Sequence, residues 1–189
     1  MKRIIIVVIV TLFLVTSVSA CSTGNLTDDE KNLLITLNDV EKFGISAGGS
    51  SEGESFLKNR NLDCSIELEY EYDSEKDPAS TGNLWLKSVV EIYRTVPGAQ
   101  TAYKDTLNAI KLGTFFGSKN VDMREDKNLF VWGNDNFGTV LEKNSVKLGN
   151  IILTRKGNTI FILYLAGFYF DDPRLLHDLI VPKLEKAVP

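Results

Sequence analysis

Acidic residues at alternate positions in one segment are the clearest candidates for chemistry in this chain. The row consists of Glu67, Glu69, Glu71 and Asp73, and apolar or aromatic residues stand between them, so residues 64–73 have the period of a half-buried strand. Carboxylates two residues apart on one strand face lie about 7 Å apart and could bind a cation or a basic partner. The alternative interpretation is a solvated sheet face beside Lys87 and Arg94 of the next strand.

The single histidine, His177, is a weak candidate for catalysis. It cannot form a two-histidine metal site, and a Ser-His-Asp arrangement would lack the Gly-x-Ser-x-Gly elbow. We therefore expect a surface or boundary histidine, and no catalytic residue, metal ligand or cofactor. The alternative is an enzyme that uses carboxylates alone, such as a glycan hydrolase, which needs two carboxyl groups about 5–9.5 Å apart in a cleft.

The first 20 residues have the layout of a secretory signal. Lys2 and Arg3 precede an almost purely apolar segment, residues 4–15, and small residues follow it. The run Val18-Ser19-Ala20-Cys21 resembles the lipobox of bacterial lipoproteins.

This resemblance implies cleavage after Ala20 and acylation of Cys21, with chains such as palmitate. Two acyl chains anchor a protein stably in a bilayer. By the same resemblance, Ser22 favours the outer membrane in a host with two membranes, and the outer face of the plasma membrane is the alternative. We expect a signal peptide over residues 1–20, a lipidated tether over 21–26 and one globular domain over 27–189.

Charge and cysteine content limit the possible partners. The formal charge is −4, and removing Lys2 and Arg3 from the 21 basic residues leaves 19 against 25 acidic ones, or −6. This balance argues against nucleic acid. Once Cys21 is acylated, Cys64 has no disulfide partner, and we expect a small core residue, with a reactive thiol as the alternative. The oligomeric state stays open.

Periodicity and turn residues predict an α+β domain. The predicted helices cover 28–36, 97–112 and a C-terminal segment from Pro173, which Pro182 should kink or break. The predicted strands cover 64–73, 84–94, 129–132, 137–142, 150–156 and 159–166. Residues 44–54 are rich in Gly and Ser and should form a loop, while Gly157-Asn158 predicts a hairpin. Because residues 160–165 are apolar throughout, they should form a central strand covered on both faces.

The aromatic run Phe168, Tyr169 and Phe170 follows that central strand. Such rings are usually core. Some of them could instead line a cleft or touch a membrane or partner, because they lie in the loop that leaves the strand.

The order of elements, with the Arg155–Asn158 hairpin, resembles PsbP/Mog1-like domains and extracytoplasmic sensor domains. The resemblance implies an antiparallel sheet with packed helices, in a two-layer or sandwich arrangement, and carries no functional residue. Our leading hypothesis is a non-enzymatic lipoprotein that binds the bilayer through acylated Cys21 and serves an envelope protein partner. A surface-exposed sensor or antigen is a further alternative.

Overall fold

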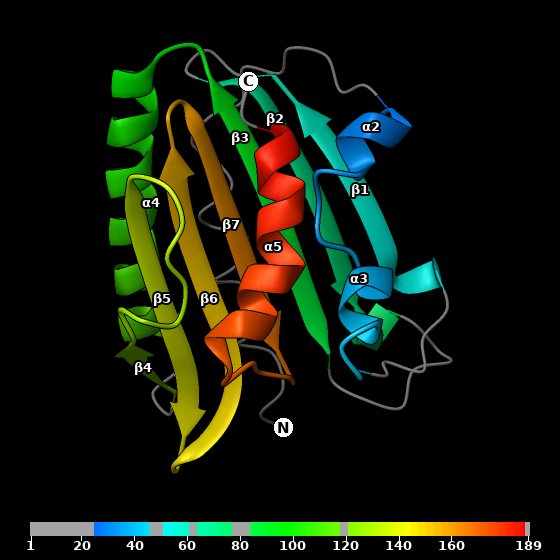
Figure 1. Cartoon of the computed structure of the whole chain (residues 1–189). Coiled ribbons are helices and arrows are strands. Elements are labelled where there is room, and N and C mark those ends of the chain that lie inside the picture. Colours follow the sequence, from blue (N-terminus) through cyan, green and yellow to red (C-terminus); the bar gives the residue numbers. More distant parts are fainter. Residues whose placement is uncertain (1–24, 46–50, 61–63, 77–83, 118–120, 188–189) are drawn as a thin grey trace.

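A single open antiparallel sheet of seven strands organises the molecule (Figure 1). The computed structural model describes residues 25–45, 51–60, 64–76, 84–117 and 121–187, so the signal segment and Cys21 lie outside it. The strand order is β1-β2-β3-β7-β6-β5-β4. The strands are β1 (Glu54–Asn59), β2 (Cys64–Asp73), β3 (Trp85–Tyr93), β4 (Asp122–Glu125), β5 (Asp135–Lys143), β6 (Val146–Lys156) and β7 (Thr159–Ala166).

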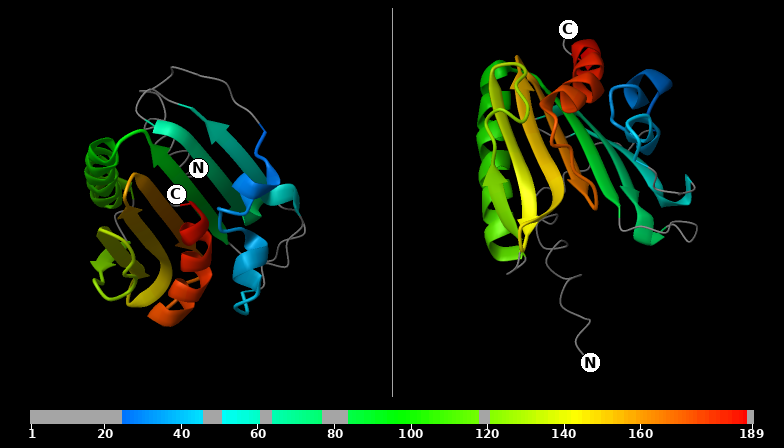
Figure 2. Two further views of the ribbon diagram at one scale, coloured as in Figure 1. Left: turned by 45° about the horizontal axis from the view of Figure 1, so that its top comes forward. Right: turned by 60° about the horizontal axis from the view of Figure 1, so that its bottom comes forward.

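Helices cover both faces of the sheet. Figure 2 shows α5 (Pro173–Ala187), α2 (Asp28–Lys31) and α3 (Leu37–Glu41) on one side and α4 (Val96–Gly117) on the other. Two 3-10 turns, Ser51–Gly53 and Ser74–Lys76, flank β1 and β2. The predicted α+β class and antiparallel sheet are confirmed. Within the described residues, no helix is long and apolar enough to cross a membrane.

The prediction of a central strand over 160–165 is confirmed. β7 is fourth in the strand order, and Phe161 and Leu163 are fully buried on the α5 side while Ile160 is fully buried on the α4 side. The predicted hairpin is also present: Lys156 pairs with Thr159, and Gly157 has a φ of +58°, which favours glycine.

The N-terminal segment differs from the predicted helix over 28–36. The capping box of Thr27 and Glu30 is present, but α2 ends at Lys31, and a second box at Thr36 and Asp39 starts α3. Between the two helices the chain turns toward the sheet, where the Ile35 backbone N–H donates to Ser88 Oγ (3.0 Å). A helix running through residue 36 could not make this bond, because the Ile35 N–H would donate within the helix.

The strand predictions are right for the centre of the sheet and wrong at its edges. β1 and β4 were not predicted. Both are edge strands that pair with one neighbour only, and such strands need no regular pattern of apolar residues. The predicted strand over 129–132 is a loop in which Leu129, Phe130 and Trp132 are buried in the core and Val131 is exposed. The loop backbone forms hydrogen bonds with side chains and not with a neighbouring strand. The Trp132 N–H donates to Asn136 Oδ1 (2.7 Å), and Thr154 Oγ1 donates to Trp132 O (2.6 Å).

Three further boundaries differ from the sequence prediction. The helix predicted over 97–112 continues past Gly113 and ends at Gly117, the second of the two glycines that could end it. Pro182 does not end α5, which continues to Ala187. The run Asn134-Asp135-Asn136 has the composition of a turn, but Asp135 and Asn136 belong to β5. The apolar residues of α5 recur at helical spacing, which predicts a buried stripe of Leu175, Leu176, Leu179, Ile180 and Leu184. Four of these residues are buried, and Leu175 is 38% exposed.

Candidate functional site

The acidic row lies on the same side of the sheet as α4, but α4 does not extend over β2. α4 packs on β3, β7 and β6 through the cluster that includes Val89, Ile162 and Leu153. Figure 2 shows α4 beside this part of the sheet and away from β1 and β2. On the opposite face of β2, Leu68, Tyr70 and Tyr72 are almost fully buried. The predicted division of β2 into an apolar and an acidic face is therefore confirmed.

Each glutamate of the row has a polar neighbour that fixes its side chain. Glu69 forms an ion pair with Lys87 of β3 (2.8 Å), as the strand pairing predicted. Glu67 accepts a hydrogen bond from the Asn59 side chain (3.0 Å), and Glu71 accepts one from Trp85 Nε1 (2.9 Å). These contacts orient the three carboxylates of the row, each of which has about four acceptor positions.

A further carboxyl group, Glu91 of β3, lies directly across from Glu67. Burial raises the pKa of Glu91 to about 7, the Tyr93 hydroxyl opposes this by donating to its Oε2 (2.9 Å), and the charge of Glu67 adds to the increase. Like charges opposite each other on neighbouring strands repel. The negative charge of the surface beside α4 therefore increases when Glu91 loses its proton.

Two aromatic rings complete the surface. Trp85 of β3 and Tyr164 of β7 are in tilted contact, with ring centroids 5.8 Å apart. Burial, together with Glu91 and Glu69, raises the pKa of Tyr164 to about 12. We use the name carboxylate face for the part of the sheet formed by Ser55, Leu57, Asn59, Glu67, Glu69, Glu71, Trp85, Lys87, Glu91 and Tyr164.

The carboxylate face presents most of its charged groups as a row along β2. Within the described part of the chain, no group of three or more His, Cys, Asp or Glu residues could hold a metal ion. The glutamates of β2 stand in one row on a sheet and point the same way, whereas a glycoside hydrolase holds two carboxyl groups on either side of the bond that it cleaves. The row instead presents regularly spaced negative charges beside aromatic rings.

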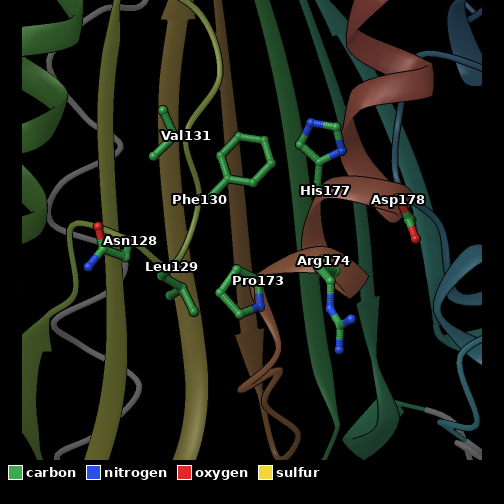
Figure 3. Close-up of a pocket in the computed structure, with 8 residues that line it drawn as sticks. All are labelled: Asn128, Leu129, Phe130, Val131, Pro173, Arg174, His177 and Asp178. Carbon is green, nitrogen blue, oxygen red and sulfur yellow. The ribbon is translucent and has the colours of Figure 1, made fainter.

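His177 lies in a different place, at a depression of about 290 Å³ between residues 128–131 and the first turns of α5 (Figure 3). Its floor contains the buried side chains of Leu129 and Phe130, and its rim contains Val131, which is 63% exposed. His177 is exposed there, as predicted. Arg174, also on the rim, binds Asp172 (2.8 Å).

The aromatic run after β7 is held against the domain. Phe170 is 3% exposed, its backbone exchanges two hydrogen bonds with the Asn150 side chain (2.6 and 3.2 Å), and Phe168 packs against its ring (5.1 Å). Tyr169 is half-buried, with the Lys147 ammonium 5.0 Å from its ring centroid. Phe170 therefore lies in the core, and Phe168 and Tyr169 are partly buried at its border.

The sequence identified the row but not the residues around it. Arg94, expected opposite the row, lies one residue beyond β3 and is exposed. Glu91 was overlooked, although it stands four residues after Lys87 on β3 and so lies on the same face. Trp85 lies on this face because it is two residues before Lys87, and Tyr164 because it pairs with Lys87. Cys21 lies outside the described residues, and the Cys64 side chain is not described.

Comparisons with known proteins identify the fold and no family. No family model and no curated protein sequence matches the chain. Among solved structures, the extracellular domain of PknH from Mycobacterium tuberculosis is similar, with a TM-score of 0.50 and 8% sequence identity over 86% of this chain and 98% of that chain. At this identity the likeness extends to the arrangement of strands and helices alone.

Proposed function

We propose that this protein is a lipid-anchored envelope protein that binds a basic segment of a protein partner on its carboxylate face and does not catalyse a reaction. The observation that carries the binding role is the carboxylate face itself. Three glutamates of one strand are oriented by Asn59, Lys87 and Trp85 beside the part of the sheet that α4 covers. Oriented carboxylates lose little conformational entropy when they bind a cationic side chain.

Charge complementarity favours a cationic partner. Glu67, Glu69 and Glu71 lie on the carboxylate face, and Lys87 is the one basic residue among the residues that define this face. Glu91 adds a further negative charge as the pH rises past about 7. Lysine and arginine side chains pair with carboxylates, and they also stack on aromatic rings such as those of Trp85 and Tyr164. Such contacts speed association and select the partner by charge more than they add affinity.

The proposed lipid anchor and cellular location are supported mainly by the sequence that precedes the described domain. The lipobox at Val18–Cys21 supports acylation of Cys21, and the similarity to an extracellular domain fits a position outside the cytoplasm. Leu26, at the end of the proposed tether, is 8% exposed and belongs to the core. Four residues, 22–25, would then separate the lipid from the domain, and they span at most about 14 Å. The carboxylate face would thus act close to the membrane, on the periplasmic side of an outer membrane or outside a plasma membrane.

Copurification tests the binding role. The protein, solubilised in mild detergent after cross-linking in cells, should capture a protein partner, and Glu67→Gln with Glu69→Gln should reduce capture at least tenfold, since two charge-assisted contacts are lost. The matched control is Glu41→Gln with Glu185→Gln, an equal charge change at exposed positions of α3 and α5. Equal capture by the two double variants would refute a role for the carboxylate face.

Mass spectrometry of the mature protein tests the anchor separately. We expect an N-terminal Cys21 carrying acyl chains, and Cys21→Ser should leave an unprocessed chain. Retention of Met1, or an unmodified thiol at Cys21, would refute the lipoprotein assignment while leaving the binding role to the cross-linking experiment.

A further inference from the structure

The two edges of the sheet are protected differently. The β4 edge is four residues long, and its Arg124 forms an ion pair with Glu142 of β5 (3.1 Å). The β1 edge is six residues long and carries Leu57, which is 47% exposed, near its middle. The one basic residue of β1, Lys58, is bound to Glu30 of α2 and lies on the opposite side of the strand from Leu57. Short length and charged side chains are the usual protections against strand addition. β1 is longer than β4, and its two charged residues, Glu54 and Lys58, both lie on the α5 side, where they bind Tyr70 and Glu30, so the other side of this edge carries no charge.

The β1 edge also borders the acidic row. Ser55 pairs with Glu71 and Leu57 pairs with Glu69, so these side chains share the carboxylate face, and both Ser55 and Leu57 are exposed. In the described sheet, β1 pairs on one side only, with β2. Neighbouring strands lie about 4.8 Å apart, so a strand added outside β1 would lie about 10 Å from β2. A long basic side chain on that strand can extend over the small Ser55 toward Glu71.

We propose that the β1 edge binds an extended segment of a protein partner as an eighth strand, with lysine or arginine at every second position. This inference rests on the proposed function and specifies how the partner binds. Backbone hydrogen bonds to β1 would supply affinity, as in other cases of strand addition. The alternating basic side chains would all point to the carboxylate face, where the row selects for their charge.

A pair of synthetic peptides tests this binding mode on the full-length protein purified in detergent. The first peptide alternates lysine and threonine. The second has the same sequence with every peptide nitrogen methylated, so that it keeps the charges and has no backbone donors. We expect the first to bind at least tenfold more tightly, because several backbone hydrogen bonds are lost in the second. Hydrogen exchange of amides in residues 54–59 should slow with the first peptide only.

Substitutions locate the bound peptide. Leu57→Lys places a positive charge beside Glu69 on the β1 edge and should weaken binding of the first peptide about tenfold, the scale of a lost charge-assisted contact. The control is Leu112→Lys on α4, where the leucine is 54% exposed, and it should bind normally. Equal loss in both variants would refute the location.

The outcomes separate this inference from the proposed function. If both peptides bind equally, if β1 amides keep their exchange rate, and if Glu67→Gln with Glu69→Gln abolishes binding, strand addition is refuted and the carboxylate face remains the site. If neither peptide binds, strand addition is refuted together with the preference for a basic segment. If β1 amides are protected without peptide and protection rises with protein concentration, a second copy of this chain occupies the edge, and the proposed partner is wrong.

Discussion

The two faces of β2 contrast a surface built for stability with one that keeps its polar groups accessible. On the α5 side, Tyr70 and Tyr72 are fully buried and even the hydroxyl of Tyr70 is bonded, accepting from Leu37 N–H (3.0 Å) and donating to Glu54 (2.9 Å). On the α4 side, Glu69 retains 14% exposure and pairs with Lys87, which retains 25%. Neighbouring residues of one strand thus serve different purposes, because the pleat sends them to opposite faces.

The contrast predicts that stability depends on the α5 side. Phe161→Ala should destabilise the protein by about 3–5 kcal/mol, since it removes a fully buried ring from the central strand. The control, Leu57→Ala on the carboxylate face, should change the free energy of unfolding by less than about 0.5 kcal/mol. Urea unfolding followed by circular dichroism measures both. Similar losses in the two variants would contradict the division between the faces.

The next largest effect concerns Glu91, the carboxyl group of the carboxylate face that burial affects most. Its pKa is raised from 4.5 to about 7, so the folded state binds more protons than the unfolded state between these values. The contribution of Glu91 to stability is therefore fully present below about pH 4.5 and is lost as the pH rises through about 7. Glu91→Gln should remove this loss and stabilise the protein by about 2–3 kcal/mol at pH 8 and hardly at all at pH 4.

Glu67→Gln is the control for that pH dependence. It removes the like charge opposite Glu91 and should recover only the smaller, electrostatic part of the loss, because burial is the larger cause. Denaturant unfolding at several pH values measures both variants. A Glu91→Gln protein whose stability still falls between pH 4.5 and 8 by the original amount would show that another group is responsible.

A smaller effect is expected at the contacts that hold the N-terminal segment on the α5 side. Tyr70→Phe keeps the ring and removes the hydroxyl, leaving the Leu37 N–H and the Glu54 carboxylate without this partner. The cost should be about 1–3 kcal/mol, the usual penalty for unsatisfied buried groups. Hydrogen exchange should accelerate in α3 more than in α4. Unchanged exchange in α3 would mean that this hydroxyl does not hold the segment.

The same contrast explains which parts of the fold could be predicted from the sequence. β2 and β7 were predicted because burial on one face or on both leaves a clear pattern of side chains. β4, with the sequence Asp-Met-Arg-Glu, has no such pattern, and only its pairing with β5 makes it a strand. The turn between β5 and β6 was missed because Asn144 and Ser145 adopt positive φ angles of 51° and 65° without a glycine.

Only the part of the candidate site that depends on local sequence patterns was predicted. Local alternation placed Glu67, Glu69 and Glu71 on one face, and the pairing of adjacent segments correctly brought Lys87 to them. Tyr164 is 77 positions beyond Lys87 in the chain and reaches the site only because β7 pairs with β3. Such a contact depends on the strand order of the whole sheet, which no local pattern specifies.

The smallest predicted effect is at the ion pair of the carboxylate face. A double-mutant cycle of Glu69→Gln and Lys87→Met should give a coupling energy below about 1 kcal/mol, since both groups keep contact with solvent. The coupling should shrink further in high salt. Partner capture should nevertheless fall in Glu67→Gln with Glu69→Gln. An ion pair that contributes so little to folding does not explain why the three glutamates of the row stand together, so weak coupling together with lost capture would favour binding as their role. A coupling energy above about 2 kcal/mol would instead make the ion pair part of the folding core and remove the contrast between the two faces.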